Sequence, residues 1–424
     1  MIMCKILLTL AIFTFFDTVA GKLVSVTVLF RHGARAPTDK LLHSNDERLF
    51  PNGLGELTAL GIDRSFELGT FLRELYVKTG FLRAKLLPSQ ALSKIGKQFT
   101  IVWRSRISYS FLILEVLWVT GFYRHFGTTK HVYFRSKANN RCLMTAALVA
   151  NGMFDASSAN GKVSVPVYSQ ESNDTLLGGT ITCDLERNRM FATCGKYPML
   201  HYDHFTEYEG FVYDCMGLRK KGAIYRDGKS FSYTDTIINM EQNGLRLPSW
   251  FAPRRNKIYW SWFQVQNFIL GSGQYHDPNV LRLKSGFLLH TILSDLNSNW
   301  EMFKANGSLE ERKFVAYSTQ DWLIHALLNA LGVHTGSNVL PTYDNSNVLP
   351  SYNSLIMIEL HEINGQPFVK LWYRDHVTVQ RYDLTRTLRG CESLDMCPLN
   401  KMLNCCTQYT TAHPIEECHP NKTS

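Results

Sequence analysis

The stretch Val28-Leu29-Phe30-Arg31-His32-Gly33-Ala34-Arg35-Ala36-Pro37 is the part of this sequence that decides the fold. The apolar, β-branched residues 22–30 that lead into it predict a buried strand. In open α/β sheets, ligands bind at the carboxyl ends of the strands. Two arginines around a histidine at such an end therefore predict a site for an oxyanion such as phosphate. The alternative is that both arginines are solvated and that His32 merely caps the strand.

The pattern Arg31-His32-Gly33-x-Arg35-x-Pro37 resembles the signature of the histidine acid phosphatases, the secreted branch of the histidine phosphatase superfamily. The resemblance implies an α/β fold similar to phosphoglycerate mutase. Its central sheet would be mixed and mostly parallel, flanked by helices and covered by an inserted, mainly helical cap. It also implies hydrolysis of phosphate monoesters through a phosphohistidine, with His32 as the nucleophile and with Arg31 and Arg35 as phosphate-binding residues.

Two later segments repeat the order of strand, polar turn and helix start. The first predicts a strand over 131–136 and a helix over 141–148, which puts Arg141 at a helix N-terminus, where anions are favoured. This segment resembles the family's second arginine motif, which makes Arg141 a phosphate-binding residue. The second predicts a strand over 313–319 and a helix over 322–331, closed by a glycine. It resembles the family's His-Asp motif, which makes Asp321 the proton donor to the leaving alcohol.

Position 320 departs from the family pattern, because Gln320 stands where the family has its second histidine. A glutamine amide donates only a neutral hydrogen bond, and a charge-assisted one is roughly twice as strong. Losing one such transition-state contact costs about 2.7–4 kcal/mol, or about 10²–10³ in rate. We therefore expect Gln320 to contact the phosphate in a slow enzyme. The alternative is a pseudophosphatase that binds phosphorylated ligands. His325 should point away from the strand end.

The expected substrate is a small phosphate monoester, and nothing in the sequence selects a particular one. Arginines can supply the positive charge that metal ions supply elsewhere, so we expect no cofactor and no metal. Formal net charge is +9, but residues 83–130 hold eight basic residues and one acidic residue. This excess lies outside any recognisable nucleic-acid-binding motif, so we expect no nucleic-acid partner. A homodimer is an expectation by analogy with the family alone.

The basic range 83–130 is an addition to the family pattern, and two explanations stay open. It is either a real surface loop or translated sequence, such as a retained intron, that does not belong in the working protein; we favour the second. If it disrupts the protein, the product is non-functional. The other expected divisions are a core (about 22–82, 131–150 and 285–380), a cap (about 151–284) and a cysteine-rich tail (390–424), all within one domain over 21–424.

Residues 1–20 have the layout of a cleaved signal peptide, with a lysine, an apolar run and small residues before the cleavage point. A membrane anchor is the alternative, but the run is shorter than the ~20 residues that a spanning helix needs. We therefore expect a secreted, extracellular protein without a membrane anchor, or one in the lysosomal lumen. Three glycosylation sequons, at Asn173, Asn306 and Asn421, agree with export.

Nine cysteines remain after residue 20, which in an exported protein predicts disulfides with one cysteine left over. The resemblance implies a short pair between Cys391 and Cys397 and a long-range pair between Cys194 and Cys418. Outside these motifs, periodicity predicts helices over 52–76, interrupted near Gly61, and over 286–296. A hairpin over 354–363 and 367–374 should turn at Asn364-Gly365.

Overall fold

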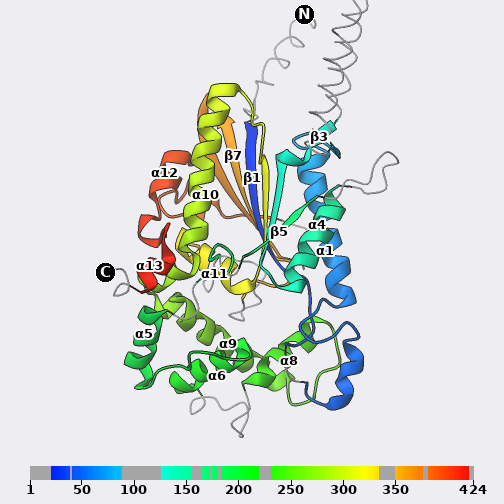
Figure 1. Ribbon diagram of the computed structural model, residues 1–424, viewed down its shortest axis with the longest axis vertical. Helices are drawn as coiled ribbons and strands as arrows, with labels where there is room; N and C mark the ends of the chain where they lie inside the picture. The colour runs from blue at the N-terminus through cyan, green and yellow to red at the C-terminus, as the bar shows by residue number, and fades with distance from the viewer. Residues whose placement is uncertain are drawn as a thin grey trace, which may run out of the picture.

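A mixed sheet forms the centre of the protein (Figure 1). The computed structural model describes residues 21–38, 41–87, 126–154, 165–171, 174–179, 183–218, 231–333, 349–375 and 381–419. The sequence predictions for residues 1–20, for Asn173 and Asn421 and for most of the basic range 83–130 lie outside these residues.

The strand order is β10-β8-β7-β1-β6-β4-β5, and β9 also pairs with β8. The strands are β1 (Lys22–Arg31), β4 (Val132–Ser136), β5 (Val167–Ser169), β6 (Phe314–Thr319), β7 (Leu355–Ile363), β8 (Gln366–Arg374), β9 (Tyr382–Asp383) and β10 (Cys397–Pro398). Strands β5, β4, β6 and β1 are parallel, whereas the remaining pairings are antiparallel. The predicted mixed α/β sheet is thus confirmed, but its parallel part is confined to four strands. Two short strands, β2 (Lys85–Leu87) and β3 (Phe126–Thr128), pair separately.

Helices cover both faces of the sheet and the carboxyl ends of its parallel strands (Figure 1). Helices α1 (Ala59–Leu72) and α4 (Asn140–Met153) lie on one face. Helices α10 (Pro278–Asn306), α11 (Asp321–Leu331), α12 (Leu399–Asn404) and α13 (Pro414–Cys418) lie on the other. Beyond the strand ends lie α5 (Asp184–Cys194), α6 (Phe205–Cys215), α8 (Ser232–Gln242) and α9 (Arg255–Leu270). Short turns of helix occur at Ser44–Leu49, Arg73–Val77, Thr129–His131, Ala252–Arg254, Gly273–Tyr275, Thr385–Thr387 and Thr407–Tyr409.

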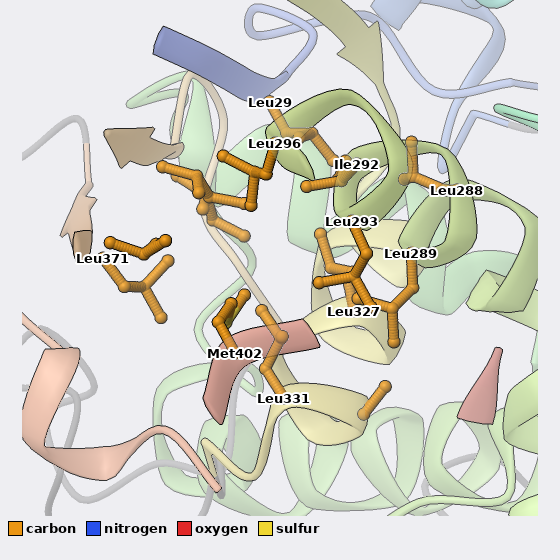
Figure 2. Packing of buried hydrophobic residues seen from close by; sticks show 14 of the residues in the cluster. Leu29, Leu288, Leu289, Ile292, Leu293, Leu296, Leu327, Leu331, Leu371 and Met402 are labelled. Carbon is orange, nitrogen blue, oxygen red and sulfur yellow. The ribbon is translucent and has the colours of Figure 1, made fainter. Parts of the chain in front are cut away.

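Two apolar cores hold these layers together, and β1 contributes to both. Val28 and Phe30 face α1 and α4, where they meet side chains such as Leu68 and Val149. Leu29 points to the opposite face and packs among the leucines of α10 and α11 (Figure 2). Because neighbouring strand residues point to opposite faces, a strand that is apolar throughout must be covered on both sides. Burial of each such side chain contributes about 1.5–3 kcal/mol, which anchors the strand that ends at His32.

Helix α1 begins at Ala59 and is continuous, so the predicted start at residue 52 and the predicted interruption near Gly61 are both wrong. Thr58 caps the helix, and its Oγ1 accepts a hydrogen bond from the Gly61 N–H at 3.3 Å. Gly61 lies in the first turn, where an added Cβ would be only 2.0 Å from the carbonyl oxygen of Ala34. The glycine is therefore needed because the loop that follows β1 passes directly against the helix.

The remaining sequence predictions agree with the structure in most places. The hairpin of β7 and β8 turns at Asn364 and Gly365, both with positive φ, as a two-residue hairpin turn requires. Helix α11 ends at Gly332 in the left-handed conformation. The predicted helix over 286–296 is part of the longer α10. Within the range predicted as the cap, β5 pairs with β4, so that portion belongs to the sheet.

The disulfides correct one prediction. Cys391 pairs with Cys397, as the resemblance implied. Cys418 pairs with Cys183, whereas Cys194 pairs with Cys215, so the predicted link between Cys194 and Cys418 is wrong. The disulfide between Cys194 and Cys215 links the last residue of α5 to the last residue of α6. Their Cα atoms are 5.0 Å apart, a typical distance for a disulfide.

One vicinal pair, Cys405–Cys406, completes the set of disulfides. Among the nine cysteines that the structure describes, Cys142 is outside these disulfides, and it is buried. One such cysteine agrees with the odd count after residue 20. In the part of the chain that the structure describes, no helix combines the length and apolarity needed to cross a bilayer.

Candidate active site

Three parallel strand ends bring the predicted site residues into one cavity. In the β1–β6 register Arg31 lies beside Thr319, and the N–H of His32 donates to the Thr319 carbonyl at 3.0 Å. Strand β4 ends on the other side of β6. The cavity between these ends and the cap helices is lined by all six predicted residues, namely Arg31, His32, Arg35, Arg141, Gln320 and Asp321.

His32 is buried and is held in one tautomer by its own loop. Its Nδ1 lies 2.9 Å from the carbonyl oxygen of Gly33. A carbonyl can only accept a hydrogen bond, so Nδ1 carries the proton and Nε2 keeps its lone pair. The backbone N–H of Gly33 in turn donates to Thr145 Oγ1 on α4 at 3.0 Å. The loop thus holds a neutral imidazole with a free nitrogen at the cavity.

Arg31 is fixed on several sides beside His32. One Nη donates to the Pro350 carbonyl at 2.8 Å, and the other forms an ion pair with Asp321 at 2.9 Å. The Tyr352 ring lies 4.1 Å from the guanidinium, in a cation–π contact. The ion pair also fixes the carboxyl group of Asp321, the first residue of α11, at the cavity.

The cap helix α8 positions Arg35 through a forked ion pair. Asp235 accepts from the two Nη atoms of Arg35 at 2.7 and 3.2 Å. It also accepts from the backbone N–H of Thr38 at 3.0 Å. Although burial raises the pKa of Asp235, the Arg35 guanidinium holds it below its usual range. Asp235 therefore remains charged and keeps Arg35 in place.

A polar stripe on α8 continues this attachment. Asn239 donates to Asp235 and lies one turn away from it, and Asn243 donates to the Arg35 carbonyl at 3.0 Å. Thr58 at the start of α1 donates to the other amide atom of Asn243 at 2.7 Å. The sequence reasoning missed this stripe. Its only signal is the spacing of four residues between three short polar side chains, which marks one face of a helix.

Arg141 is the second residue of α4 and is held more loosely. Its Nη1 lies 3.5 Å from the Gly55 carbonyl, at the limit of a hydrogen bond. Its buried Nε has no hydrogen-bond partner among the described residues, and the same is true of Nε in Arg31 and Arg35. Buried donors without acceptors are costly, and an oxyanion in the cavity would supply acceptors.

Gln320 precedes Asp321 at the end of β6 and has a partner that the sequence did not reveal. Its Oε1 accepts from Lys137 Nζ at 2.7 Å and from the indole N–H of Trp322 at 2.9 Å. Lys137 follows β4 directly and also lines the cavity. Among the described residues the site therefore contains a cation near position 320 that the family resemblance did not indicate.

The cap closes the cavity with aromatic and acidic groups. Phe205, Tyr208 and Trp262 line its outer part. Glu209 is buried there and accepts from Gln266, and burial raises its pKa to about 8. No group of three or more His, Cys, Asp or Glu side chains in the described ranges is placed to hold a metal ion.

His325 lies outside this cavity, as predicted. It is buried in α11, where its Nε2 lies 2.8 Å from Asn267 Oδ1 and 3.3 Å from Ser272 Oγ. Burial lowers its pKa to about 3. The side chain therefore acts as a neutral packing residue between α11 and α9.

We expect His32 to stay neutral at acidic pH. Burial lowers its pKa well below the ordinary value, and the three neighbouring arginines lower it further. As the pH falls through ~6.5, where a free histidine gains its proton, the His32 imidazole should remain unprotonated. Proton NMR can follow the titration, with the His32 signal assigned by its loss in a His32→Ala variant. A midpoint near 6.5 would contradict this expectation.

Comparisons with known proteins agree with this geometry. The family described as "Histidine phosphatase superfamily (branch 2)" matches residues 22–200. Over 422 residues the chain is 27% identical to putative acid phosphatase 1 of Caenorhabditis briggsae, covering 97% of this chain and 85% of that protein. The chain is therefore similar to the histidine phosphatase superfamily, branch 2.

Two further proteins match this chain over a similar extent. Prostatic acid phosphatase of Homo sapiens is 24% identical over 413 residues, covering 91% of this chain and 85% of that protein. The structure of Hafnia alvei phytase in complex with tartrate matches with a TM-score of 0.57 and 15% identity, covering 94% of this chain and 98% of that chain. The predicted resemblance to this family and the predicted fold class are both confirmed.

Proposed function

We propose that this protein is a histidine phosphatase of the superfamily's branch 2, an exported acid phosphatase that hydrolyses phosphate monoesters through a phosphohistidine. The observation that carries the proposal is the meeting of His32, three arginines and Asp321 in one cavity. The free Nε2 of a neutral imidazole is a nucleophile, and fixed guanidinium groups match the oxygens of a phosphoryl group. The aromatic outer part of the cavity suits an apolar organic group on the ester.

The proposed reaction has two steps. His32 Nε2 attacks phosphorus, the ester P–O bond breaks, and Asp321 gives its proton to the leaving oxygen. Water then attacks the phosphohistidine and passes a proton to the Asp321 carboxylate, and the P–N bond breaks to release phosphate. The arginines stabilise the charge on the equatorial oxygens in both steps, which is the main demand of phosphoryl transfer.

Gln320 bears on the rate of this reaction. It offers a neutral amide where the family pattern has a second histidine, so we propose reduced activity. The alternative remains a pseudophosphatase that binds phosphorylated ligands without turnover. The presence of Asp321 at the cavity favours the enzyme, since a binding protein has no use for a proton donor.

An assay on an aryl phosphate from about pH 3 to pH 8 separates these two possibilities. The range spans the ordinary pKa values of carboxyl and imidazole groups. Release of inorganic phosphate, highest on the acidic side, supports the enzyme. Binding of phosphate or vanadate without any turnover supports the pseudophosphatase. Absence of both binding and turnover contradicts both.

A Gln320→His variant should raise kcat about tenfold or more. A histidinium restores a charge-assisted hydrogen bond to the transition state, worth about 10²–10³ in rate in comparable sites. We expect the gain at acidic pH, where the imidazole is charged, and its disappearance as the pH rises past the pKa of the new histidine. Steady-state kinetics of both proteins across that range measure it. An unchanged kcat at every pH would show that position 320 does not limit the reaction.

Export is the remaining part of the proposal. Disulfide pairs tie the cap and the tail together, and disulfides persist in oxidising compartments. The sequon residue Asn306 is exposed at the end of α10, where a glycan would meet no obstacle from the helix. These features support a secreted or lysosomal location.

A further inference from the structure

Lys137 occupies a position in the cavity that the proposed chemistry does not yet use. It follows β4 directly, and its backbone N–H donates to the Ser318 carbonyl at 3.0 Å, which fixes the turn against β6. Its side chain is partly buried and lines the same cavity as His32 and the three arginines. The ammonium group donates a hydrogen bond to Gln320 Oε1 at 2.7 Å. It also lies 5.2 Å from the centre of the Trp322 ring.

These contacts determine which way the Gln320 amide faces. An ammonium group and an indole N–H are both donors and cannot accept a hydrogen bond. The atom of Gln320 that meets both must therefore be its carbonyl oxygen. The NH2 group is consequently turned away from Lys137 and Trp322 and is left to donate elsewhere. A cation on the amide oxygen also polarises the amide and strengthens it as a donor.

We propose that Lys137 is a positioning residue that completes the phosphate site, by holding the Gln320 amide toward the anion and by adding a positive charge behind it. The inference rests on the proposed function of the same cavity. Lys137 and Gln320 together supply an oriented donor and a positive charge. The charge lies one amide group further from the anion than that of a histidinium, so the gain expected from Gln320→His still applies.

The charged surroundings of Lys137 come from three helices. Arg141 and Cys142 on α4, Asp321 on α11 and Lys284 on α10 face it. Burial lowers the pKa of Lys137 to about 8, so the ammonium is present at acidic and neutral pH. Asp321 and a bound phosphate both favour the charged form, whereas Arg141 and Lys284 oppose it.

Calorimetric binding of inorganic phosphate at about pH 5, well below that pKa, tests the inference. A Lys137→Met variant keeps the length of the side chain and loses its charge. A unit charge one amide group away from an anion in a partly buried site corresponds to roughly 10- to 100-fold in affinity, so Kd should rise by about that factor. A Lys304→Met variant, which removes an exposed lysine of α10, should bind like the wild type.

The outcomes separate this inference from the proposed function. If the wild-type protein neither binds phosphate nor hydrolyses an aryl phosphate, the proposed function is overturned, and the inference with it. If it hydrolyses the ester without binding phosphate, only the inference is overturned. If the wild type binds and a folded Lys137→Met variant binds within about twofold of it, only the role of Lys137 is overturned. Thermal unfolding of each variant establishes that it is folded.

A Lys137→Arg variant supplies a readout that a purely structural role would not change. In the wild type, phosphate affinity should fall as the pH rises from about 7 to 9, because Lys137 loses its proton. Arginine keeps its charge throughout this range. Burial raises the pKa of Glu209 to about 8, within the same pH range. Because Glu209 is present in both proteins, its effect on phosphate affinity is the same in both pH curves. Parallel pH curves for the two proteins would overturn the inference even if Lys137→Met failed to fold.

Discussion

A His32→Ala variant is expected to lose at least about 10⁴-fold in kcat on any phosphate monoester, as removal of a covalent nucleophile does in other enzymes. In the described part of the chain, His32 is the imidazole on the cavity, and its Nδ1 contact with Gly33 leaves Nε2 free for attack. The arginines remain in the variant, so binding of inorganic phosphate should persist. Steady-state kinetics and calorimetry on the same preparation measure the two effects.

A matched control for this variant is His290→Ala, because His290 lies on α10 and does not line the cavity. It should retain the activity of the wild type. Rapid quenching during turnover of a labelled substrate should leave phosphate on the wild-type protein but not on His32→Ala. Equal turnover by His32→Ala and the wild type would exclude the phosphohistidine route.

Replacement of Asp321 by asparagine should lower kcat on an alkyl phosphate by about 10²–10⁴-fold, the usual contribution of a general acid. An alkoxide leaves poorly without a proton. A phenolate with electron-withdrawing groups leaves well without one, so hydrolysis of the corresponding aryl phosphate should fall much less. The measurement is therefore a comparison of kcat on two substrates that differ in the acidity of their leaving groups.

Asp235→Asn provides the contrast, since Asp235 holds Arg35 and is not proposed to transfer a proton. Its loss should lower the rate on both substrates to a similar extent. Asparagine at position 321 also releases Arg31 from its ion pair, which affects both substrates alike. Only the excess loss on the alkyl phosphate reports proton donation. Equal losses on both substrates by Asp321→Asn would contradict the assigned role.

Most of the fold was accessible from local sequence patterns. The apolar run before Arg31 predicts a strand that is covered on both faces, and β1 is such a strand. The turn residues Asn364 and Gly365 locate the hairpin because few residues adopt positive φ without cost. Gly61 led to a wrong prediction. A glycine usually destabilises a helix and so predicts a break, whereas here it allows the loop at Ala34 to pass close to the helix.

The residues that carry the proposed chemistry could also be predicted, because carboxyl ends of parallel strands meet at one edge of a sheet. Arg31, Arg141 and Asp321 each follow or adjoin such an end. What surrounds them could not be predicted. Asp235 reaches Arg35 from a helix 200 positions away in the sequence, and nothing in the local pattern of α8 indicates its target.

The sequence by itself therefore determined the strand that ends just before His32, the resemblance to the family and the set of candidate catalytic residues, since these depend on short-range patterns. Only the tertiary structure decided the disulfide pairing of Cys418 and the contact between Lys137 and Gln320. Both depend on the distance between segments that are far apart in the chain, which no local pattern encodes. In the sequence, Gln320 stands where a charged histidine is expected, and no positive charge is apparent near it. In the folded protein Lys137, which is distant in the chain, brings a positive charge to Gln320.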